Sequence, residues 1–234
     1  MPLSAHAIPI LSDNYAWLLR DEATGMTAFV DPAEAAPCLS AIEAAGGRLD
    51  LILLTHHHGD HIAATEDLRA RYGAPVVGAA ADAHRLPALS RAVAEDDEVA
   101  LGDSSLRVIE TPGHTVGHIA FFGDGVLVCG DTLFSLGCGR LLEGTATDMF
   151  ASLQKLAGLP PDTLVCCGHE YTQSNARFAL QADPGNAALQ ARASAVDAQR
   201  SAGQPTVPSR LGAELAENPF LRAPDVATLA RLRT

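Results

Sequence analysis

The chain has 234 residues, a hydrophobic share of 47% and a formal net charge of −12 at pH 7. A chain of this length can bury a sizeable core, and an acidic balance without any basic block argues against nucleic acid or an anionic membrane as a partner. No apolar run approaches the length needed to span a bilayer, and residues 1–10 lack the pattern of a signal peptide.

The cysteine pattern predicts free thiols. The chain has five cysteines, an odd number, and Cys166 and Cys167 are adjacent, which is a poor geometry for bridging. Free thiols are typical of a reducing compartment, so we expect a cytoplasmic protein. Cys129, Cys166 and Cys167 fall within apolar segments and are interpreted as small buried side chains rather than nucleophiles.

Short apolar segments run through the first 170 residues and are predicted to be strands. Residues 51–54 form an aliphatic run after Gly46 and Gly47, which indicates a buried strand. Further strands are predicted at residues 5–10, 15–19, 27–30, 75–77, 106–110, 119–122, 126–129 and 164–167, and helices at residues 33–45 and 61–72. This mixture of hairpins and βαβ spacings predicts two sheets layered with helices rather than one doubly wound sheet.

The last part of the chain has a different character. From Thr172 onward the sequence is rich in Ala, Gln and Arg with helical periodicity, interrupted at residues 183–185 and 203–208. We therefore predict a small helical appendage and divide the chain into residues 1–170 and residues 171–234.

The segment directly after the strand at residues 51–54 carries the densest chemical signal. His56 and His58 are two residues apart, so in extended backbone their side chains point to one face while His57 points to the other. Asp60 and His61 follow where the chain turns and can face a second point nearby. The segment predicts a site for two metal ions.

Three further residues of the same kind follow predicted strands, each beside a glycine that lets the backbone turn tightly. They are His114, Asp131 and His169, after the strands that end near residues 110, 129 and 167. A single His or Asp after a strand is usually a hydrogen-bonding residue, a turn former or a helix cap. Turn chemistry does not explain the joint pattern, which favours a metal site.

The histidine segment resembles the His-x-His-x-Asp-His motif of the metallo-β-lactamase superfamily. Other segments resemble its glyoxalase II branch, the hydroxyacylglutathione hydrolases: residues 11–15, 111–118, 130–134, 137–140 and 168–172. The Gly-Cys-Gly-Arg and Gly-His-Glu-Tyr-Thr segments specify the branch. The resemblance implies an α/β fold, a four-layer αββα sandwich in which residues 1–170 form the catalytic domain and residues 171–234 form a small helical substrate-binding domain.

The resemblance also implies protein ligands for two divalent metal ions. These ligands form two groups joined by one carboxylate: His56, His58 and His114 for one metal, Asp60, His61 and His169 for the other, and Asp131 as the bridge. Nitrogen-rich groups suit zinc, with iron or manganese as alternatives, and a shared carboxylate keeps two cations close.

The remaining histidines are interpreted as structural. His57 is expected to point away from the metals, as a donor behind the ligands or as a packing residue. His118 is expected to be a hydrogen-bonding residue, and His6 and His84 to lie at the surface or at helix ends.

The expected reaction is thioester hydrolysis, in which a metal-bridging hydroxide, oriented by Asp60 as the catalytic residue, attacks the carbonyl carbon. A thiolate leaving group has a pKa of roughly 8.5 and departs with little protonation, whereas an amide nitrogen needs a general acid. The resemblance implies S-D-lactoylglutathione as the substrate, hydrolysed to D-lactate and glutathione in methylglyoxal detoxification. The expected partner is therefore a small-molecule glutathione thioester, and the expected state is a monomer.

For the substrate, the resemblance points to Arg140, Tyr171 and Arg233 as binding groups. Leu142 stands where some members have tyrosine, which removes one hydroxyl contact. The family has an arginine followed closely by Lys-Asp near its C-terminus; Arg233 matches the arginine and no lysine follows it. The expected consequence is either a weaker glutathione affinity than in longer relatives or compensation by Arg222 or Arg210.

Two rival hypotheses remain. The first is another enzyme of this fold: a mononuclear iron persulfide dioxygenase using mainly His56, His114 and Asp131, a lactonase or a β-lactamase. The helical tail and the Gly-His-Glu-Tyr-Thr segment argue against the dioxygenase. A non-catalytic metal-binding protein is the second, but structural zinc sites usually close their coordination with cysteines, and the histidine segment contains none.

Overall fold

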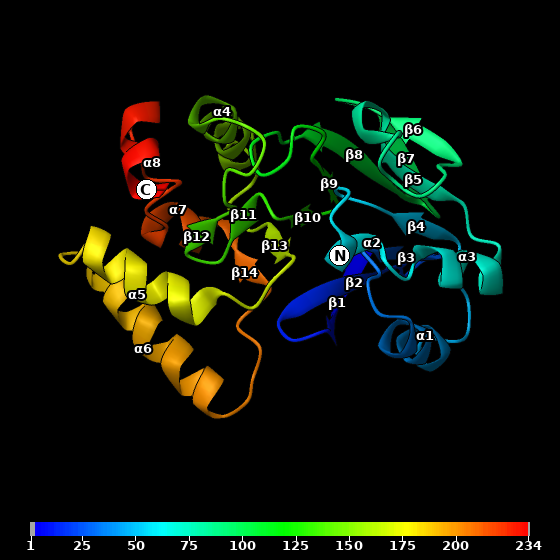
Figure 1. The fold of residues 1–234 in the computed structure, drawn as a ribbon. Helices are drawn as coiled ribbons and strands as arrows, with labels where there is room; N and C mark the ends of the chain where they lie inside the picture. The colour runs from blue at the N-terminus through cyan, green and yellow to red at the C-terminus, as the bar shows by residue number, and fades with distance from the viewer. Residues whose placement is uncertain (1–2, 234) are drawn as a thin grey trace.

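The structure, a computed structural model that describes residues 3–233, contains two six-stranded sheets and one two-stranded hairpin within those residues (Figure 1). Residues 1, 2 and 234 lie outside the described part. They include the first residues of the predicted catalytic domain, where a signal peptide was sought, and the last residue of the predicted C-terminal domain.

The first sheet holds its strands in chain order, namely β1 (Leu3–Ile10), β2 (Asn14–Asp21), β3 (Thr27–Val30), β4 (Leu51–Leu53), β5 (Val76–Ala79) and β6 (Arg91–Val93). Strands β1 to β3 pair antiparallel, and β3 to β6 pair parallel. Parallel neighbours need a crossover, and α1 (Ala35–Ala44) and α3 (Thr65–Tyr72) lie on the connections between them.

Side chains of this sheet alternate between two cores, as the two-residue period of a strand requires. Trp17 and Leu53 face the core shared with the second sheet, whereas Leu18 and Ile52 face a separate core that includes Ile42 of α1. The sheet is therefore buried on both sides, and functional side chains that a ligand can reach must lie in the loops at the ends of its strands.

The second sheet has the order β14 (Ser209–Arg210), β13 (Leu164–Cys167), β10 (Val126–Gly130), β9 (Ile119–Gly123), β8 (Ser104–Glu110) and β7 (Glu98–Leu101). Helix α4 (Ala146–Ala157) packs Met149 and Leu153 into the same core. It lies on the opposite side of the sheets from α1 (Figure 1). The predicted four-layer αββα sandwich is confirmed.

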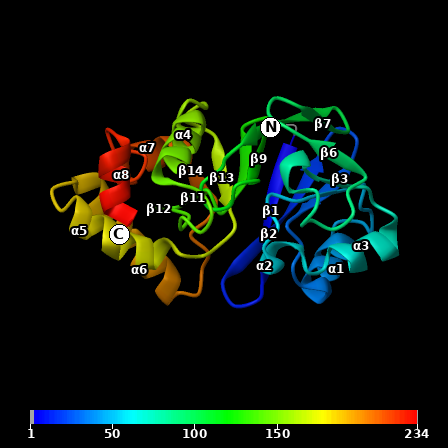
Figure 2. The same cartoon turned by 45° about the horizontal axis from the view of Figure 1, so that its top comes forward.

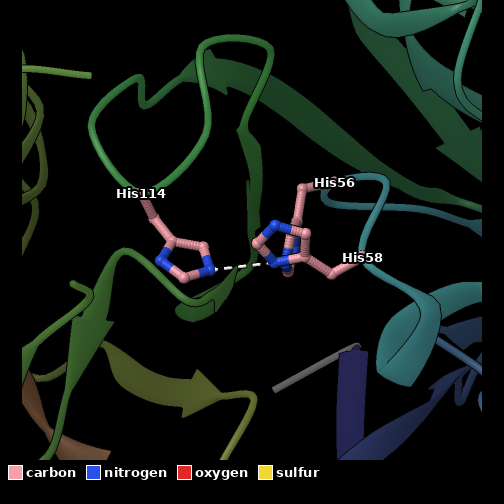
Figure 3. A group of neighbouring side chains, drawn as sticks. All are labelled: His56, His58 and His114. Carbon is pink, nitrogen blue, oxygen red and sulfur yellow. Dashed lines mark hydrogen bonds between the residues drawn. The ribbon is translucent and has the colours of Figure 1, made fainter. Parts of the chain in front are cut away.

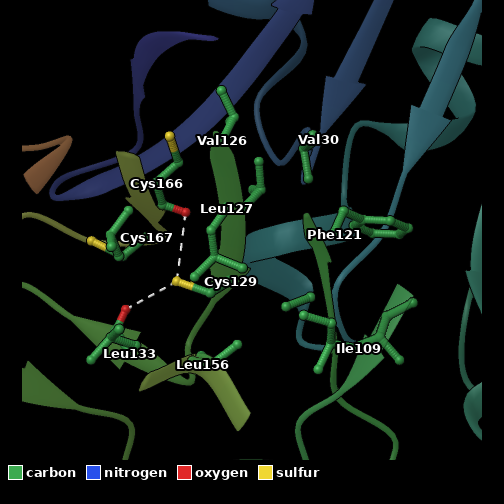
Figure 4. Packing of buried hydrophobic residues seen from close by; sticks show 14 of the residues in the cluster. Val30, Ile109, Phe121, Val126, Leu127, Cys129, Leu133, Leu156, Cys166 and Cys167 are labelled. Atoms are coloured by element: carbon green, nitrogen blue, oxygen red, sulfur yellow. Dashed lines mark hydrogen bonds between the residues drawn. The ribbon is translucent and has the colours of Figure 1, made fainter. Parts of the chain in front are cut away.

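The centre of the main core combines aliphatic side chains and Phe121 with the strand cysteines (Figure 4). Cys129 is fully buried, and its thiol donates to the carbonyl of Leu133 at 3.2 Å. Burial raises the pKa of Cys129 well above its ordinary value and raises that of Cys167 to about 12. Such thiols stay protonated, which agrees with their interpretation as small buried side chains.

The C-terminal helices gather at one end of the molecule (Figure 2): α5 (Thr172–Ala182), α6 (Ala187–Ser201), α7 (Leu211–Glu217) and α8 (Val226–Arg233). The breaks predicted at residues 183–185 and 203–208 fall between α5 and α6 and after α6. Beside these helices lies the hairpin of β11 (Leu133–Phe134) and β12 (Gly137–Cys138), and β12 contacts α5. Within the described chain, no helix is long and apolar enough to cross a membrane.

The sequence-based elements needed correction in two places. The single helix predicted at residues 61–72 is two, α2 (Gly59–Ile62) and α3, because the Ala64 amide donates to the Pro32 carbonyl outside the helix. Helix α4 and the short strands β6, β7, β11, β12 and β14 were not predicted. Helix α4 has a capping box in its sequence, since Thr145 and Asp148 bond each other's backbone amides.

Replacing Thr145 with Ala should lower the free energy of unfolding by about 1 kcal/mol, because the amide of Asp148 loses its side-chain acceptor. Urea-induced unfolding measures the change. Thr145→Ser, which keeps the hydroxyl, is the matched control and should unfold close to the parent. Equal stability of the Thr145→Ala variant and the parent would contradict the role of the cap.

Candidate metal centre and substrate pocket

The predicted ligands come from segments that follow four different strands, and Asp31, which was not predicted, follows a fifth; all meet at one edge of the two sheets. Asp31 follows β3, His56 and His58 follow β4, and the loop after β8 carries His114. Asp131 follows β10 directly, and His169 lies two residues after β13. The side chains are therefore brought together by strand ends rather than by proximity in the sequence.

The first group is a cluster of three imidazole nitrogens (Figure 3). The Nε2 atoms of His56 and His114 each lie 3.1 Å from Nδ1 of His58. Ligands of a tetrahedral zinc ion with bonds of 2.0–2.1 Å would be about 3.3 Å apart. The three nitrogens therefore have the spacing that a single small cation needs.

The second group lies beside the first and is joined to it by Asp131. Within this group, Oδ2 of Asp60 lies 3.9 Å from Nε2 of His61 and 3.6 Å from Nε2 of His169. The carboxylate of Asp131 lies 3.3 Å from both His61 and His169, and 3.5 Å from Nε2 of His114 in the first group. Asp131 thus lies within 3.5 Å of histidines in both groups.

Two atoms in this cluster test whether the residues fit a cation. Nε2 of His61 and Oδ1 of Asp131 are buried and have no hydrogen-bond partner among the described residues. Burying a polar atom without a partner is costly, and such atoms need an ion or a ligand to compensate. The donor set of imidazoles and carboxylates is also one that divalent metals prefer. The residues fit a metal site.

Asp31 orients His61 from behind. Its buried carboxylate accepts hydrogen bonds from the Thr55 amide at 2.8 Å and from the Thr55 hydroxyl at 2.6 Å. It also lies 3.0 Å from Nδ1 of His61, so Nε2 of that ring is left to face Asp131. A carboxylate behind a histidine sets its tautomer and raises its basicity as a ligand.

His118 orients Asp131 by the same logic but through the backbone. The amide of Asp131 donates to Nε2 of His118 at 3.1 Å, so the proton of this ring is on Nδ1, which lies 2.9 Å from the Thr111 hydroxyl. Burial and the neighbouring His114 lower the pKa of His118 to about 3, which keeps the acceptor nitrogen free. The predicted structural role of His118 is confirmed.

The two groups differ in their electrostatics. Burial lowers the pKa of His56, His58 and His114, so these imidazoles are neutral, as ligands must be. Burial also opposes charge on His61 and His169, but Asp131 outweighs it and raises the pKa of both. The second group therefore attracts positive charge, and a divalent cation supplies it without a proton.

His57 points away from the ligands, as predicted. Its Nδ1 lies 3.0 Å from Asp82, and its Nε2 lies 3.5 Å from Glu143. Both acids also pair with Arg85, and Glu143 accepts from the Val116 amide at 2.9 Å. This outer cluster connects the loop of His58 to the loop that presents His114.

A cavity of about 410 Å³ opens onto the metal-ligating groups. The residues predicted to bind substrate line it, namely Arg140, Tyr171 and Arg233. Tyr171 stacks on His169 with ring centroids 4.5 Å apart and nearly parallel planes. The carbonyl of Arg140 lies 2.8 Å from Nδ1 of His114, so the substrate wall and the metal cluster share a hydrogen bond.

The proposed compensating arginines do not reach this cavity. Arg222 pairs with Asp183, and Arg210 donates to the Asp162 carbonyl at 2.6 Å. Neither is among the residues that line the cavity, so the expectation that one of them replaces a missing lysine is wrong. Leu142 does line the cavity and is 58% exposed, which places an apolar side chain at its rim.

Sequence reasoning missed several residues at the site. Asp31 follows a predicted strand, which is the signal that was used for Asp131 and could have found it. Asp13 lies 3.1 Å from Nδ1 of His169, and Asn14 donates to Asp60 at 3.0 Å. Their segment was noted only for its resemblance. Phe134 and Asn175 line the cavity and carried no signal that a metal pattern could reveal.

The sequence matches the metallo-beta-lactamase superfamily over residues 24–169 and the hydroxyacylglutathione hydrolase C-terminus over residues 170–234. A hydroxyacylglutathione hydrolase of Acidiphilium cryptum (strain JF-5) is 60% identical over 227 residues, which cover 97% of this chain and 93% of the relative. The chain belongs to the hydroxyacylglutathione hydrolase family. This confirms the predicted superfamily and branch.

Solved structures of other proteins have a fold similar to that of this member of the hydroxyacylglutathione hydrolase family. ETHE1 from Myxococcus xanthus is similar with a TM-score of 0.74 and 25% identity, covering 100% of this chain and 90% of that one. TTHA1623, solved in a di-iron-bound form, is similar with a TM-score of 0.66 and 25% identity, covering 93% and 99%. Superfamily membership and the converging donors together show a divalent metal site.

Gly168 is required by space rather than by backbone conformation. It is not among the glycines with positive φ, yet a Cβ there would lie 2.5 Å from Oδ1 of Asp131 and 2.7 Å from Cε1 of His61. The glycine predicted to permit a tight turn thus permits close approach of the backbone to the metal-ligating groups.

Replacing Gly168 with Ala should weaken metal binding roughly tenfold or more, because Asp131 and His61 would have to move. Metal content after dialysis against a weak chelator measures this. Gly185→Ala is the matched control, since nothing lies within 4 Å of its Cβ position. Full metal retention by a folded Gly168→Ala variant would refute the spatial argument.

Proposed function

We propose that this protein hydrolyses the glutathione thioesters of 2-hydroxy acids, with S-D-lactoylglutathione as the substrate and D-lactate and glutathione as the products. The observation that carries the proposal is a cavity whose floor is the metal-ligating cluster and whose wall holds Arg140 and Arg233. The name of the relative from Acidiphilium cryptum supports the same reaction. This reaction would make the protein an enzyme of methylglyoxal detoxification.

We propose two metal ions. His56, His58 and His114 would hold one, Asp60, His61 and His169 the other, and Asp131 would be shared between them. The three-nitrogen group favours zinc, and iron or manganese are the alternatives, since TTHA1623 was solved with two irons. Bound there, the metals supply a Lewis acid for the carbonyl oxygen and lower the pKa of a shared water towards neutrality.

The chain's own residues prepare the site for this chemistry. Asp60 is half-exposed, lines the cavity and is held by Asn14, so its carboxylate can orient a water towards the substrate. Hydrolysis adds the water's hydroxyl to the carbonyl carbon and breaks the C–S bond, releasing the thiolate. Because a thiolate with a pKa of roughly 8.5 leaves unprotonated, the cavity needs no dedicated general acid.

Substrate binding depends on local positive charge in an acidic protein. Glutathione carries carboxylates, and the guanidinium groups of Arg140 and Arg233 at the cavity wall can pair with them despite the net charge of −12. The Tyr171 hydroxyl offers a further donor beside His169. Burial keeps this phenol protonated, since it raises the pKa of Tyr171 to about 12.

We assign residues 1–170 to the catalytic domain and residues 171–234 to the substrate-binding domain. Helix α5 begins at Thr172, and Arg233 brings the end of the second part to the cavity. A single chain provides the whole ligand set and the cavity wall, which supports a monomer. The five free thiols need no oxidising compartment, which supports a cytoplasmic enzyme.

The rival reactions of this fold are less well supported. A mononuclear iron enzyme using mainly His56, His114 and Asp131 would leave the second group of donors without a purpose. The match of residues 170–234 to the hydroxyacylglutathione hydrolase C-terminus also favours the hydrolase.

Removing the metals with a chelator should abolish hydrolysis of S-D-lactoylglutathione, and adding zinc back should restore it, because the cluster has no other electrophile. Release of free thiol measures the rate, and metal content is determined on the same preparation. A fully metallated sample without thioesterase activity would refute the proposed function.

Replacing Arg233 with Ala should raise KM about tenfold and lower kcat less, because a charged partner of the substrate is lost while the metal cluster is untouched. Steady-state kinetics with S-D-lactoylglutathione give both constants. The control is Arg222→Ala, whose side chain pairs with Asp183 away from the cavity. An unchanged KM in Arg233→Ala would remove this residue from the binding site.

A further inference from the structure

The hairpin between Asp131 and Arg140 is held in place by side chains from the C-terminal helices. We define the pocket hairpin as residues 134–138, which include the turn between β11 and β12. Its first and last residues, Phe134 and Cys138, line the cavity. The chain therefore runs from a metal-ligating carboxylate, through the pocket hairpin, to a substrate-binding arginine.

Every residue of the pocket hairpin bonds a C-terminal side chain. Asn218 donates to the carbonyls of Phe134 and Gly137 at 3.1 and 3.0 Å. The remaining contacts are Asn175 to the Ser135 carbonyl at 3.0 Å, Arg192 to the Ser135 hydroxyl at 2.9 Å, the Leu136 amide to Glu214 at 2.8 Å, and Arg233 to the Cys138 carbonyl at 3.1 Å.

The pocket hairpin depends on these contacts because it has little structure of its own. Strands β11 and β12 are two residues long each, and an isolated ribbon of that size is unstable. Leu136 has a φ of +58° and is fully buried in a small core with Ala176 of α5 and Leu189 of α6. Leu136 at the turn is thus packed into the C-terminal helices, whereas β11 contacts β13 of the second sheet and Phe134 and Cys138 belong to the main core.

Glu214 of α7 is the centre of the contact network. Its side chain is fully buried, and one oxygen accepts from the Leu136 amide and from Asn218. The other oxygen lies 3.3 Å from Arg192, which itself holds Ser135. A buried carboxylate whose oxygens are all paired keeps one geometry, because every displacement leaves a charge or a donor unpaired.

We propose that Glu214 is a positioning residue for the substrate pocket, holding the pocket hairpin so that Phe134, Cys138 and Arg140 stand at the correct distance from the metal-ligating cluster. This inference rests on the proposed function. It assigns the C-terminal helices a second task besides contributing Arg233, which is to set the shape of a wall that belongs to the catalytic domain.

The metal end of the segment is anchored independently. The amide of Asp131 is held by His118, and the Gly139 amide donates to the Thr132 carbonyl at 3.0 Å, which closes the base of the hairpin. Loosening Glu214 should therefore move the cavity wall more than the bridging carboxylate. The consequence is a change in substrate affinity with little change in the chemical step.

The decisive comparison is Glu214→Gln against Glu217→Gln. A glutamine at position 214 has one oxygen, so either the Leu136 amide or Arg192 loses its acceptor. Glu217 lies on the same helix and also pairs with Arg192 at 3.3 Å, but its carboxylate makes no hydrogen bond to the pocket hairpin. Glu217→Gln therefore removes a comparable ion pair without touching the hairpin.

We expect Glu214→Gln to raise KM for S-D-lactoylglutathione about fivefold to tenfold, the scale of one lost buried hydrogen bond, with kcat and metal content within about twofold of the parent. Glu217→Gln should stay within about twofold in both constants. A folded Glu214→Gln variant with unchanged KM, or with a KM shift matched by Glu217→Gln, would overturn the proposal.

Hydrogen exchange tests the positioning without relying on activity. Amides of residues 134–138 should exchange faster in Glu214→Gln, while those of β10 keep their protection. If the parent hydrolyses no thioester, the proposed function fails, yet this comparison still decides whether Glu214 holds the hairpin. Should Glu214→Gln not fold, Glu214→Asp keeps the charge but is one methylene shorter, so it cannot reach both the Leu136 amide and Arg192, and unchanged exchange over residues 134–138 in that variant would overturn the proposal.

Discussion

The site depends on one constraint: the carboxylate of Asp131 is buried among imidazoles and must face two groups of ligands at once. Burial would raise its pKa, but His61 and His169 hold the pKa well below its ordinary value, so it stays ionised. A buried anion needs partners on every side. The positions of His118, Gly139 and Gly168 follow from this need, since each either holds the backbone beside Asp131 or leaves room for its approach.

The same requirement links the metal cluster to the substrate wall. Asp131 begins the segment that ends in Arg140, and the Arg140 carbonyl returns to His114. The segment therefore joins the metal-ligating groups to the cavity wall, while His118 and the Thr132 carbonyl hold its Asp131 end independently of the wall.

Much of the site could be predicted because the sequence next to each of these residues shows where it lies. His56, His58, His114, Asp131 and His169 each follow an apolar strand, and strand ends at one edge converge in space. The contacts that position them are long-range and leave no local pattern, as with Glu214 and Leu136, which are 78 residues apart. Helix α4 was missed although its capping box is written in the sequence, and Arg210 and Arg222 were misjudged because charge alone does not indicate where a side chain lies.

The only tryptophan of the chain contacts the strand that leads to His169. Trp17 is buried on β2, and its indole N–H donates at 2.9 Å to the carbonyl of Cys167, two residues before His169. The single indole fluorophore of the chain is therefore attached by this hydrogen bond to the backbone that leads into the His169 loop, which carries one donor of the second group.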